Sequence, residues 1–309
     1  MSATSAVTAV GDTPLVALQK DTAGRGIEIH LKLEWFNPTG SCKDRMALAM
    51  IEGAERRGAL EPGMTVVEYT GGSTGSSLAF VCAAKGYRFH AVSSDAFAEE
   101  KLRTMRAFGA ELTIVPSTDG RITPDLIPRM RQEAERLADR SDTYFTDQFH
   151  NTDHVAGYRH LGEELLAQFD APPDVFCVAV GTAGLLMGIA EVLRAADGET
   201  RIVALEPATS AVISGGEAGP HHVEGIGVGF VPPLLREELY DDVLPVDETL
   251  GRETARRLAS EDGIFAGTST GLNVAGAMEL GQRLEPDQRV VTVAVDSGLK
   301  YLAGDLYPT

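Results

Sequence analysis

The sequence predicts an α/β protein with two domains, each built on a mainly parallel, twisted sheet that helices flank. Three observations support this fold class. Apolar, β-branched runs alternate with helical patterns of about ten residues or more, glycine-rich loops separate them, and 309 residues suit two domains. Alternating strands and helices require right-handed crossovers, which build parallel sheets. We expect a smaller, mobile domain at 40–150 and a larger one formed by 1–39 and 151–309.

The elements of the smaller domain follow in order along the chain. A turn at 11–15 and a strand at 28–34 precede it and belong to the larger domain. Gly86 is expected to cap a helix in the left-handed conformation, and 146–151 reads as a polar loop. The smaller domain should contain strands at 64–69, 88–93 and 111–115, helices from Ser41 to about Gly58 and at 76–85, 98–108 and 124–140, and an exposed turn at 117–123.

The larger domain continues with the same alternation. Its run at 175–180 is apolar throughout, as expected for a strand covered on both faces. A long irregular section at 207–233 suggests a functional loop. We expect strands at 175–180, 201–206, 242–246 and 289–295, and helices at 154–169, from the loop at 181–188 to Ala196, at 248–261 and at 271–284.

Composition and charge exclude several classes of function. The net charge of −18 argues against nucleic acid or an anionic membrane as the main partner, because phosphate binding needs clustered Lys and Arg. No apolar run approaches a membrane span, and the first ten residues lack the pattern of a signal peptide. The three cysteines form no CxxC pair, and no histidine spacing supports a metal site. A reducing cytoplasm is the expected location.

Lys43 is the first candidate for chemistry. It lies in the segment NPTGSCKDR at 37–45, where Ser41 can cap a helix, so Lys43 falls in the first helical turn. The positive end of a helix disfavours a cation, which favours the neutral amine that Schiff-base chemistry requires. The alternative is a surface lysine paired with Asp44 or Glu34. For a single lysine this alternative is the more common one, so other motifs must decide.

Two strand–loop–helix junctions offer binding sites for anions. Backbone N–H groups and the helix dipole converge at such loops. The loop at 181–185 lacks the Gly-Lys-Ser/Thr of a nucleoside-triphosphate site but could hold one phosphate monoester. The loop at 70–75 adds hydroxyl groups, which suit a carboxylate. Each loop could also be an ordinary tight turn.

A dinucleotide site is the rival interpretation of the second half. A glycine loop is followed by a strand that ends in Glu206, an acid that could hold a ribose hydroxyl. However, GTAGLLMG at 181–188 does not have the spacing G-x-G-x-x-G. An amine, a phosphate loop and a carboxylate loop together match an amino acid joined to pyridoxal phosphate. A nicotinamide-dependent dehydrogenase and a cofactor-free binding protein remain the minor alternatives.

Seven segments in order make the chain resemble one family. GDTPL at 11–15 resembles its opening GNTPL, 37–45 its lysine motif, EYTGGSTG at 68–75 its substrate loop EPTSGNTG, and GTAGL at 181–185 its phosphate loop GTGGT. GIGVGFVP at 225–232, AGTSTG at 266–271 and DSGLKYL at 296–302 resemble GIGAGFVP, AGISSG and DSGERYL. The chain thus resembles the cysteine synthase and cystathionine β-synthase family, which are pyridoxal phosphate enzymes of fold type II with the tryptophan synthase β-subunit-like fold.

The resemblance implies a role for each matching residue. Lys43 would hold pyridoxal 5'-phosphate as a Schiff base and act as the base on the substrate Cα. Ser269 would face the pyridine nitrogen, Ser73 would lie beside the cofactor ring, and Gly225 would bring backbone close to the substrate. The phosphate would be held by Gly181, Thr182, Ala183, Gly184 and Leu185, and the α-carboxylate by Thr70, Gly72, Ser73, Thr74 and Gln148.

The resemblance also implies an activity and an assembly. We expect β-replacement on O-activated L-serine, with O-acetylserine and sulfide giving L-cysteine through an aminoacrylate, in a homodimer. A related reaction with another donor or nucleophile, or a β-eliminating serine/threonine deaminase, is the alternative. The sequence departs from the family at Gly71, Ser73, Ala183 and Leu185, and at Cys42, where an aliphatic residue is usual. The first two bear on the substrate.

Overall fold

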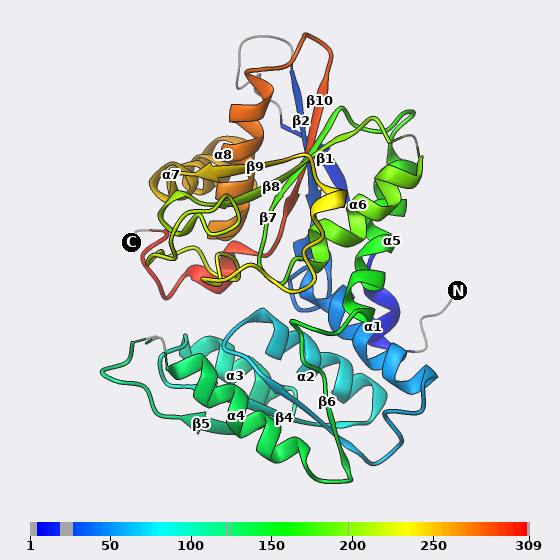
Figure 1. Cartoon of the computed structure of the whole chain (residues 1–309), viewed down its shortest axis with the longest axis vertical. Coiled ribbons are helices and arrows are strands. Elements are labelled where there is room, and N and C mark those ends of the chain that lie inside the picture. Colours follow the sequence, from blue (N-terminus) through cyan, green and yellow to red (C-terminus); the bar gives the residue numbers. More distant parts are fainter. Residues whose placement is uncertain (1–4, 19–26, 122, 124, 197, 308–309) are drawn as a thin grey trace. The chain divides into compact units, whose positions relative to one another are not determined.

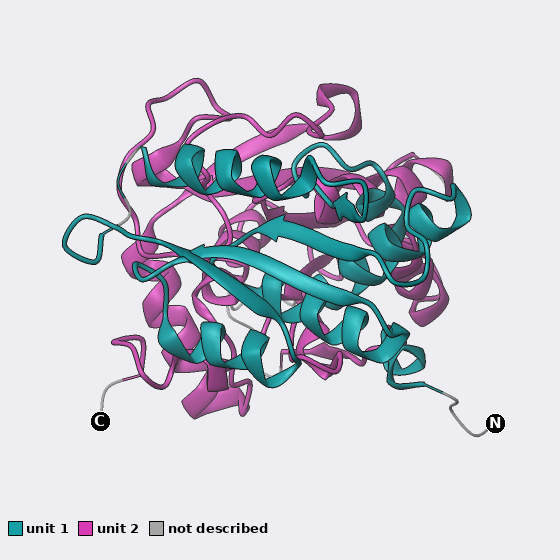
Figure 2. Ribbon diagram, turned by 90° about the horizontal axis from the view of Figure 1, so that it is seen from below, with its two compact units in different colours: residues 1–10, 43–157 teal, residues 11–42, 158–309 magenta. Residues whose placement is uncertain are grey.

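A computed structural model of the chain describes residues 5–18, 27–121, 123, 125–196 and 198–307. They divide into two compact units, which Figure 2 distinguishes by colour. Unit 1 contains residues 43–157 and a segment that ends at Val10, and unit 2 contains 11–42 and the chain from Tyr158 onward. The predicted smaller domain, 40–150, overlaps unit 1. The segment before Gly11, which we expected in the larger domain, groups with unit 1, and the predicted mobility stays a prediction.

Unit 1 contains a four-stranded parallel sheet in the order β5-β4-β3-β6. Helices lie on both of its faces (Figure 2). Because every pair is parallel, each strand is joined to the next through a helix, as the alternating pattern predicts. The elements are α1 (Lys43–Arg56), β3 (Thr65–Tyr69), α2 (Ser73–Lys85), β4 (Arg88–Ser94), α3 (Glu99–Ala107), β5 (Glu111–Val115), α4 (Leu126–Ala138) and β6 (Thr143–Phe145).

The structure corrects two expectations in unit 1, and a further one falls partly outside the described residues. Strand β6 was not predicted, because three residues are too few to show a period. Helix α2 begins at Ser73, not at residue 76, so part of the predicted loop is its first turn. Residues 122 and 124, which the predicted turn and helix include, lie outside the described residues. The left-handed cap at Gly86 is confirmed, with φ of 81°.

Unit 2 contains a six-stranded sheet in the order β1-β2-β10-β7-β8-β9, parallel except for β1. Helices α7 and α8 lie on one face and α6 on the other (Figure 1), which confirms the predicted fold class. The strands are β1 (Leu15–Ala17), β2 (Glu28–Leu33), β7 (Val175–Ala179), β8 (Arg201–Pro207), β9 (Asp242–Val246) and β10 (Arg289–Ala294). The helices are α5 (Asp153–Gln168, whose first five residues belong to unit 1), α6 (Gly184–Ala196), α7 (Glu248–Arg257) and α8 (Thr268–Gly281).

A buried polar side chain in the core of unit 2 ties α8 to the sheet. All five residues of β7 are buried, as predicted for a strand covered on both faces. Asn273 is fully buried on α8; its Oδ1 accepts from the Ala179 N–H at 2.8 Å, and its Nδ2 donates to the Val293 carbonyl at 2.8 Å. The amide therefore pins the end of β7 to β10 where the loop at 181 begins. None of the described helices is both long and apolar enough to cross a membrane.

Replacing Asn273 with alanine should destabilise the protein by about 2–4 kcal/mol, because it leaves a buried N–H and a buried carbonyl unsatisfied. Chemical denaturation followed by circular dichroism measures this change. The control is Gln282→Ala, which removes an exposed amide at the end of the same helix and should cost less than about 0.5 kcal/mol. Equal effects of the two substitutions would contradict the assignment of Asn273 as a clamp.

Candidate active site

The loop between β3 and α2 brings the predicted carboxylate-binding residues of unit 1 together. The Thr74 hydroxyl donates to Gln148 Oε1 at 2.9 Å, although 74 residues separate them. Gln148 Nε2 donates to the Tyr69 carbonyl at 3.2 Å. Thr70 Oγ1 accepts from the Gly72 N–H at 3.3 Å. Hydroxyl groups and the amides of the first turn of α2 thus gather at one helix N-terminus, where an anion is favoured.

The two glycines of this loop have different surroundings. A Cβ on Gly71 would lie 2.2 Å from the Phe97 ring, so no side chain fits there while Phe97 keeps its place. A Cβ on Gly72 would meet nothing within 4 Å. The departure from the serine that the family has at residue 71 therefore has a packing reason. The aromatic ring of Phe97 takes the space of that side chain.

Lys43 is half-buried at the first position of α1, as the sequence predicts. Its neighbour in unit 1 is His154, which is fully buried on the first turn of α5. Burial and the positive charge of Lys43 lower the pKa of His154 to about 3. The imidazole is therefore neutral across the physiological range.

In unit 2, the predicted phosphate loop packs directly on the segment that follows residue 224. A Cβ on Gly181 would lie 2.2 Å from the Gly225 carbonyl oxygen, so only glycine permits this approach of two backbones. The Gly227 N–H donates to the Val180 carbonyl at 3.1 Å. Ala183 turns the chain into α6 with φ of 71°, the left-handed conformation. The structure thus places the 181–185 loop beside Gly225 and at the N-terminus of a helix.

Ser269 lies in the first turn of α8 and is 2% exposed. The hydroxyls on either side of it are in use: Thr268 Oγ1 accepts from the Glu224 N–H at 3.2 Å, and Thr270 Oγ1 from the Val295 N–H at 3.0 Å. Helix α8 begins at Thr268, not at residue 271, so residues 268–270 form its first turn. Ser269 is consequently held on a rigid element.

Glu206, the acid of the rival dinucleotide interpretation, forms hydrogen bonds within the protein. Glu206 is buried, and its carboxylate accepts from the Ile213 N–H at 2.8 Å and the Ser214 N–H at 3.0 Å. Its oxygens therefore hold the irregular segment after β8. They are not arranged to receive a ribose hydroxyl.

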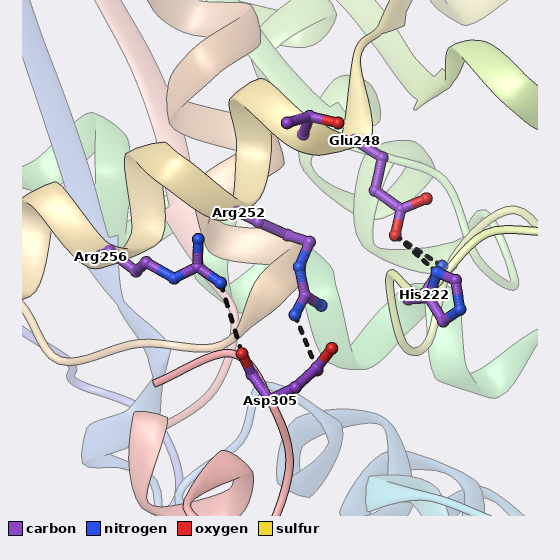
Figure 3. A pocket seen from close by; sticks show the side chains of 6 residues that line it. His222, Glu248, Arg252, Arg256 and Asp305 are labelled. Atoms are coloured by element: carbon purple, nitrogen blue, oxygen red, sulfur yellow. Dashed lines mark hydrogen bonds and ion pairs between the residues drawn. The ribbon is translucent and has the colours of Figure 1, made fainter. Parts of the chain in front are cut away.

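One cavity of unit 2 is lined by charged side chains that have partners among the described residues. The cavity has a volume of about 290 Å³, and Figure 3 shows the side chains that line it. Arg252 pairs with Asp305 at 2.7 Å, Arg256 donates to the Asp305 carbonyl at 3.3 Å, and His222 contacts Glu248 at 3.2 Å. These groups satisfy one another, so we assign the cavity no ligand.

Comparison with known proteins decides the family. The family model "pyridoxal-phosphate dependent enzyme" matches residues 7–296. A cysteine synthase of Staphylococcus aureus is 39% identical over 300 residues, which cover 96% of this chain and 95% of that protein. The chain belongs to the pyridoxal-phosphate dependent enzyme family. The seven segments that led us to this prediction all fall within or close to the matched range.

Solved structures of this pyridoxal-phosphate dependent family share the fold over nearly the full chain. A cysteine synthase from Entamoeba histolytica has a TM-score of 0.93 and 31% identity, covering 99% of this chain and 91% of that one. An O-ureido-L-serine synthase has a TM-score of 0.91 and 37% identity, covering 99% and 95%. The chain is similar to both.

The residues of this family member fit its cofactor. Backbone amides at the start of α6 and the Thr182 hydroxyl are donors of the kind that a phosphate monoester requires. Ser269 carries a neutral hydroxyl rather than a carboxylate, which would suit the pyridine nitrogen of that cofactor, and Lys43 carries the primary amine that would react with its aldehyde.

We call the proposed binding residues of unit 1 and those of unit 2 the two half-sites. From the sequence, no role was assigned to three residues near them. His154 and Asn273 lie within helical patterns and carry no signal beyond being polar. Glu68 stands in the run TVVEY of β3 and is fully buried. A carboxylate inside an apolar strand pattern is unusual, so Glu68 could have been found from the sequence.

Ala183→Gly should leave the protein as stable or stabilise it by up to about 1 kcal/mol, because the strain of the left-handed conformation outweighs the entropy that glycine adds to the unfolded chain. Thermal and urea unfolding measure the change. In the control, Ala195→Gly on the exposed side of α6 should destabilise the protein by up to about 1 kcal/mol. If Ala183→Gly lowered the free energy of unfolding as much as the control does, the backbone at residue 183 would not be strained.

Proposed function

We propose that this enzyme catalyses β-replacement on an O-activated L-serine, with O-acetyl-L-serine and sulfide giving L-cysteine. The family match over residues 7–296, with Lys43 at the start of α1, carries the proposal. Relatives named cysteine synthase, from Staphylococcus aureus and Entamoeba histolytica, support the choice of reaction. A cytoplasmic location and a homodimer, expected from the resemblance, belong to the same proposal.

Each half-site has a distinct part in this reaction. Bound pyridoxal phosphate supplies an electron sink that makes the substrate Cα proton acidic. Lys43 holds the cofactor and then accepts that proton at Nζ. The Ser269 hydroxyl would face the ring nitrogen, and Gly225 would bring backbone close to the substrate. The α-carboxylate is bound by Thr70, Gly72, Ser73, Thr74 and Gln148, and the phosphate by Gly181, Thr182, Ala183, Gly184 and Leu185.

A related reaction with another donor or nucleophile is the second candidate. One observation favours it: the Phe97 ring occupies the space of a side chain at residue 71, where the family has a hydroxyl. A solved relative named O-ureido-L-serine synthase indicates that close relatives differ in product. Assays with a panel of nucleophiles against O-acetyl-L-serine distinguish the two candidates.

Lys43→Ala should lower kcat for cysteine formation by about a thousandfold or more, because the substitution removes both the attachment point of the cofactor and the base. Cysteine release from O-acetyl-L-serine and sulfide measures this rate. Lys85→Ala is the matched control and should leave kcat nearly unchanged. Lys85 is the last residue of α2 and pairs with Glu52 and Glu55 of α1. A Lys43→Ala enzyme with nearly wild-type kcat would contradict the proposal.

Gln148→Ala should raise KM for the amino-acid donor by about tenfold or more, because a hydrogen bond to a charged carboxylate is lost. The KM for sulfide should change little. Steady-state kinetics with each substrate varied in turn test this difference. An equal change in both KM values would show that Gln148 acts through the fold rather than on the carboxylate.

A further inference from the structure

A buried carboxyl group lies directly behind the proposed carboxylate-binding residues. Glu68 is fully buried near the end of β3. Its Oε2 accepts from the Gln148 N–H at 3.0 Å and lies 2.6 Å from Thr146 Oγ1, and its Oε1 accepts from the Tyr69 N–H at 3.0 Å. Glu68 thus joins the strand that leads into the substrate loop to the segment that carries Gln148.

The segment that Glu68 holds is strained. Asp147 lies between the two residues that contact Oε2, and its φ of 44° is in the left-handed region. Such a conformation persists where the surroundings determine it. Because Glu68 contacts Thr146 on one side and Gln148 on the other, its side chain fixes this turn and with it the position of the Gln148 amide.

The contacts of Thr146 indicate which form of Glu68 the fold holds. Thr146 Oγ1 lies 2.6 Å from Glu68 Oε2 and 3.2 Å from the Val67 carbonyl oxygen. A hydroxyl group has one hydrogen, so it cannot donate fully to both oxygens. If Glu68 carries a proton, it donates to Thr146, and Thr146 donates to Val67. Both contacts are then hydrogen bonds.

The charges around Glu68 also favour the protonated form. Burial raises the pKa of Glu68 to about 8, and the negative charge of Asp147 adds to the rise, against the opposing effect of its hydrogen-bond donors. On α4, which packs on β3, Arg131 lies 4.0 Å from Asp147, and Glu135 pairs with Arg131 at 2.8 Å. Arg131 is therefore shared between two other carboxylates, and the other two arginines of α4, Arg129 and Arg136, pair with Asp125 and Glu133.

The remaining elements around β3 add no cation beside Glu68 among the residues that the structure describes. On β4, the residue opposite Glu68 is Ala91, and the neighbouring His90 contacts Thr113 at 2.8 Å. The charged residue of α2 is Lys85, at the last position of the helix, where it pairs with Glu55 at 3.0 Å.

We propose that Glu68 is a positioning residue whose protonated, neutral form permits binding of the substrate α-carboxylate, so that its ionisation weakens donor binding at alkaline pH. The substrate part of this inference rests on the proposed function. A negative charge on Glu68, two residues before Thr70 and hydrogen-bonded to the Gln148 N–H, would repel the substrate carboxylate in a medium of low dielectric constant. The protonated, neutral acid keeps the contacts with Thr146, Gln148 and Tyr69 without adding that charge.

Glu68→Gln removes the ionisable group and keeps the size of the side chain. The glutamine NH2 can donate to Thr146 as the protonated acid does, and the amide oxygen can accept from the Tyr69 N–H, whereas the acceptor of the Gln148 N–H is lost at every pH. The measured quantity is KM for O-acetyl-L-serine in the wild type divided by KM in the Glu68→Gln enzyme. This ratio should rise about tenfold from pH 6.5 to pH 9. Ionisation of the substrates affects both enzymes equally and cancels in the ratio. In Glu111→Gln, which removes an exposed carboxylate of β5, the wild-type pH profile should persist.

A second measurement does not depend on turnover. Infrared difference spectra of the wild type should contain a carboxylic acid C=O band that disappears as the pH rises through about 8 and that Glu68→Gln lacks. Absence of this band at pH 6.5, or a KM ratio that does not change with pH, overturns the inference. Absence of turnover at every pH, with the band present, counts instead against the proposed function and leaves the protonation of Glu68 supported.

Discussion

Parallel strand pairing is the constraint on which both half-sites depend. Each parallel strand must be followed by a crossover, so its carboxyl end opens onto a loop and a helix N-terminus. The loop at 70–72 follows β3, and the loop at 181–183 follows β7. In both, backbone N–H groups and the positive end of a helix dipole converge. Sheet topology therefore accounts for the positions of the two proposed anion-binding loops.

Buried polar side chains then fix the residues that these loops present. Asn273 ties the end of β7 to β10 just before the loop at 181, and Glu68 ties β3 to the turn that carries Gln148. Each group satisfies main-chain partners across elements far apart in sequence. Such contacts cost stability when one partner is removed, and they give a rigid frame to a site that must discriminate between similar small molecules.

The sequence predicts much of this structure for identifiable reasons. Strands such as β7 are apolar along their whole length, and Gly86 is a residue that suits a left-handed cap, so local patterns suffice there. The starts of α2 and α8 were misplaced because Ser73 and Thr268 belong to runs of small polar residues with no helical period. The contacts of Thr74 with Gln148, and of Gly181 with Gly225, depend on tertiary packing, which no local pattern encodes.

The covalent attachment of the cofactor to Lys43 is the central claim. Protein loaded with pyridoxal phosphate can be reduced with borohydride, digested and mapped by mass spectrometry. The account predicts a single stable pyridoxyl label, on the peptide that contains Lys43. A label on another lysine, or no label in protein that turns over O-acetyl-L-serine and sulfide, would contradict it.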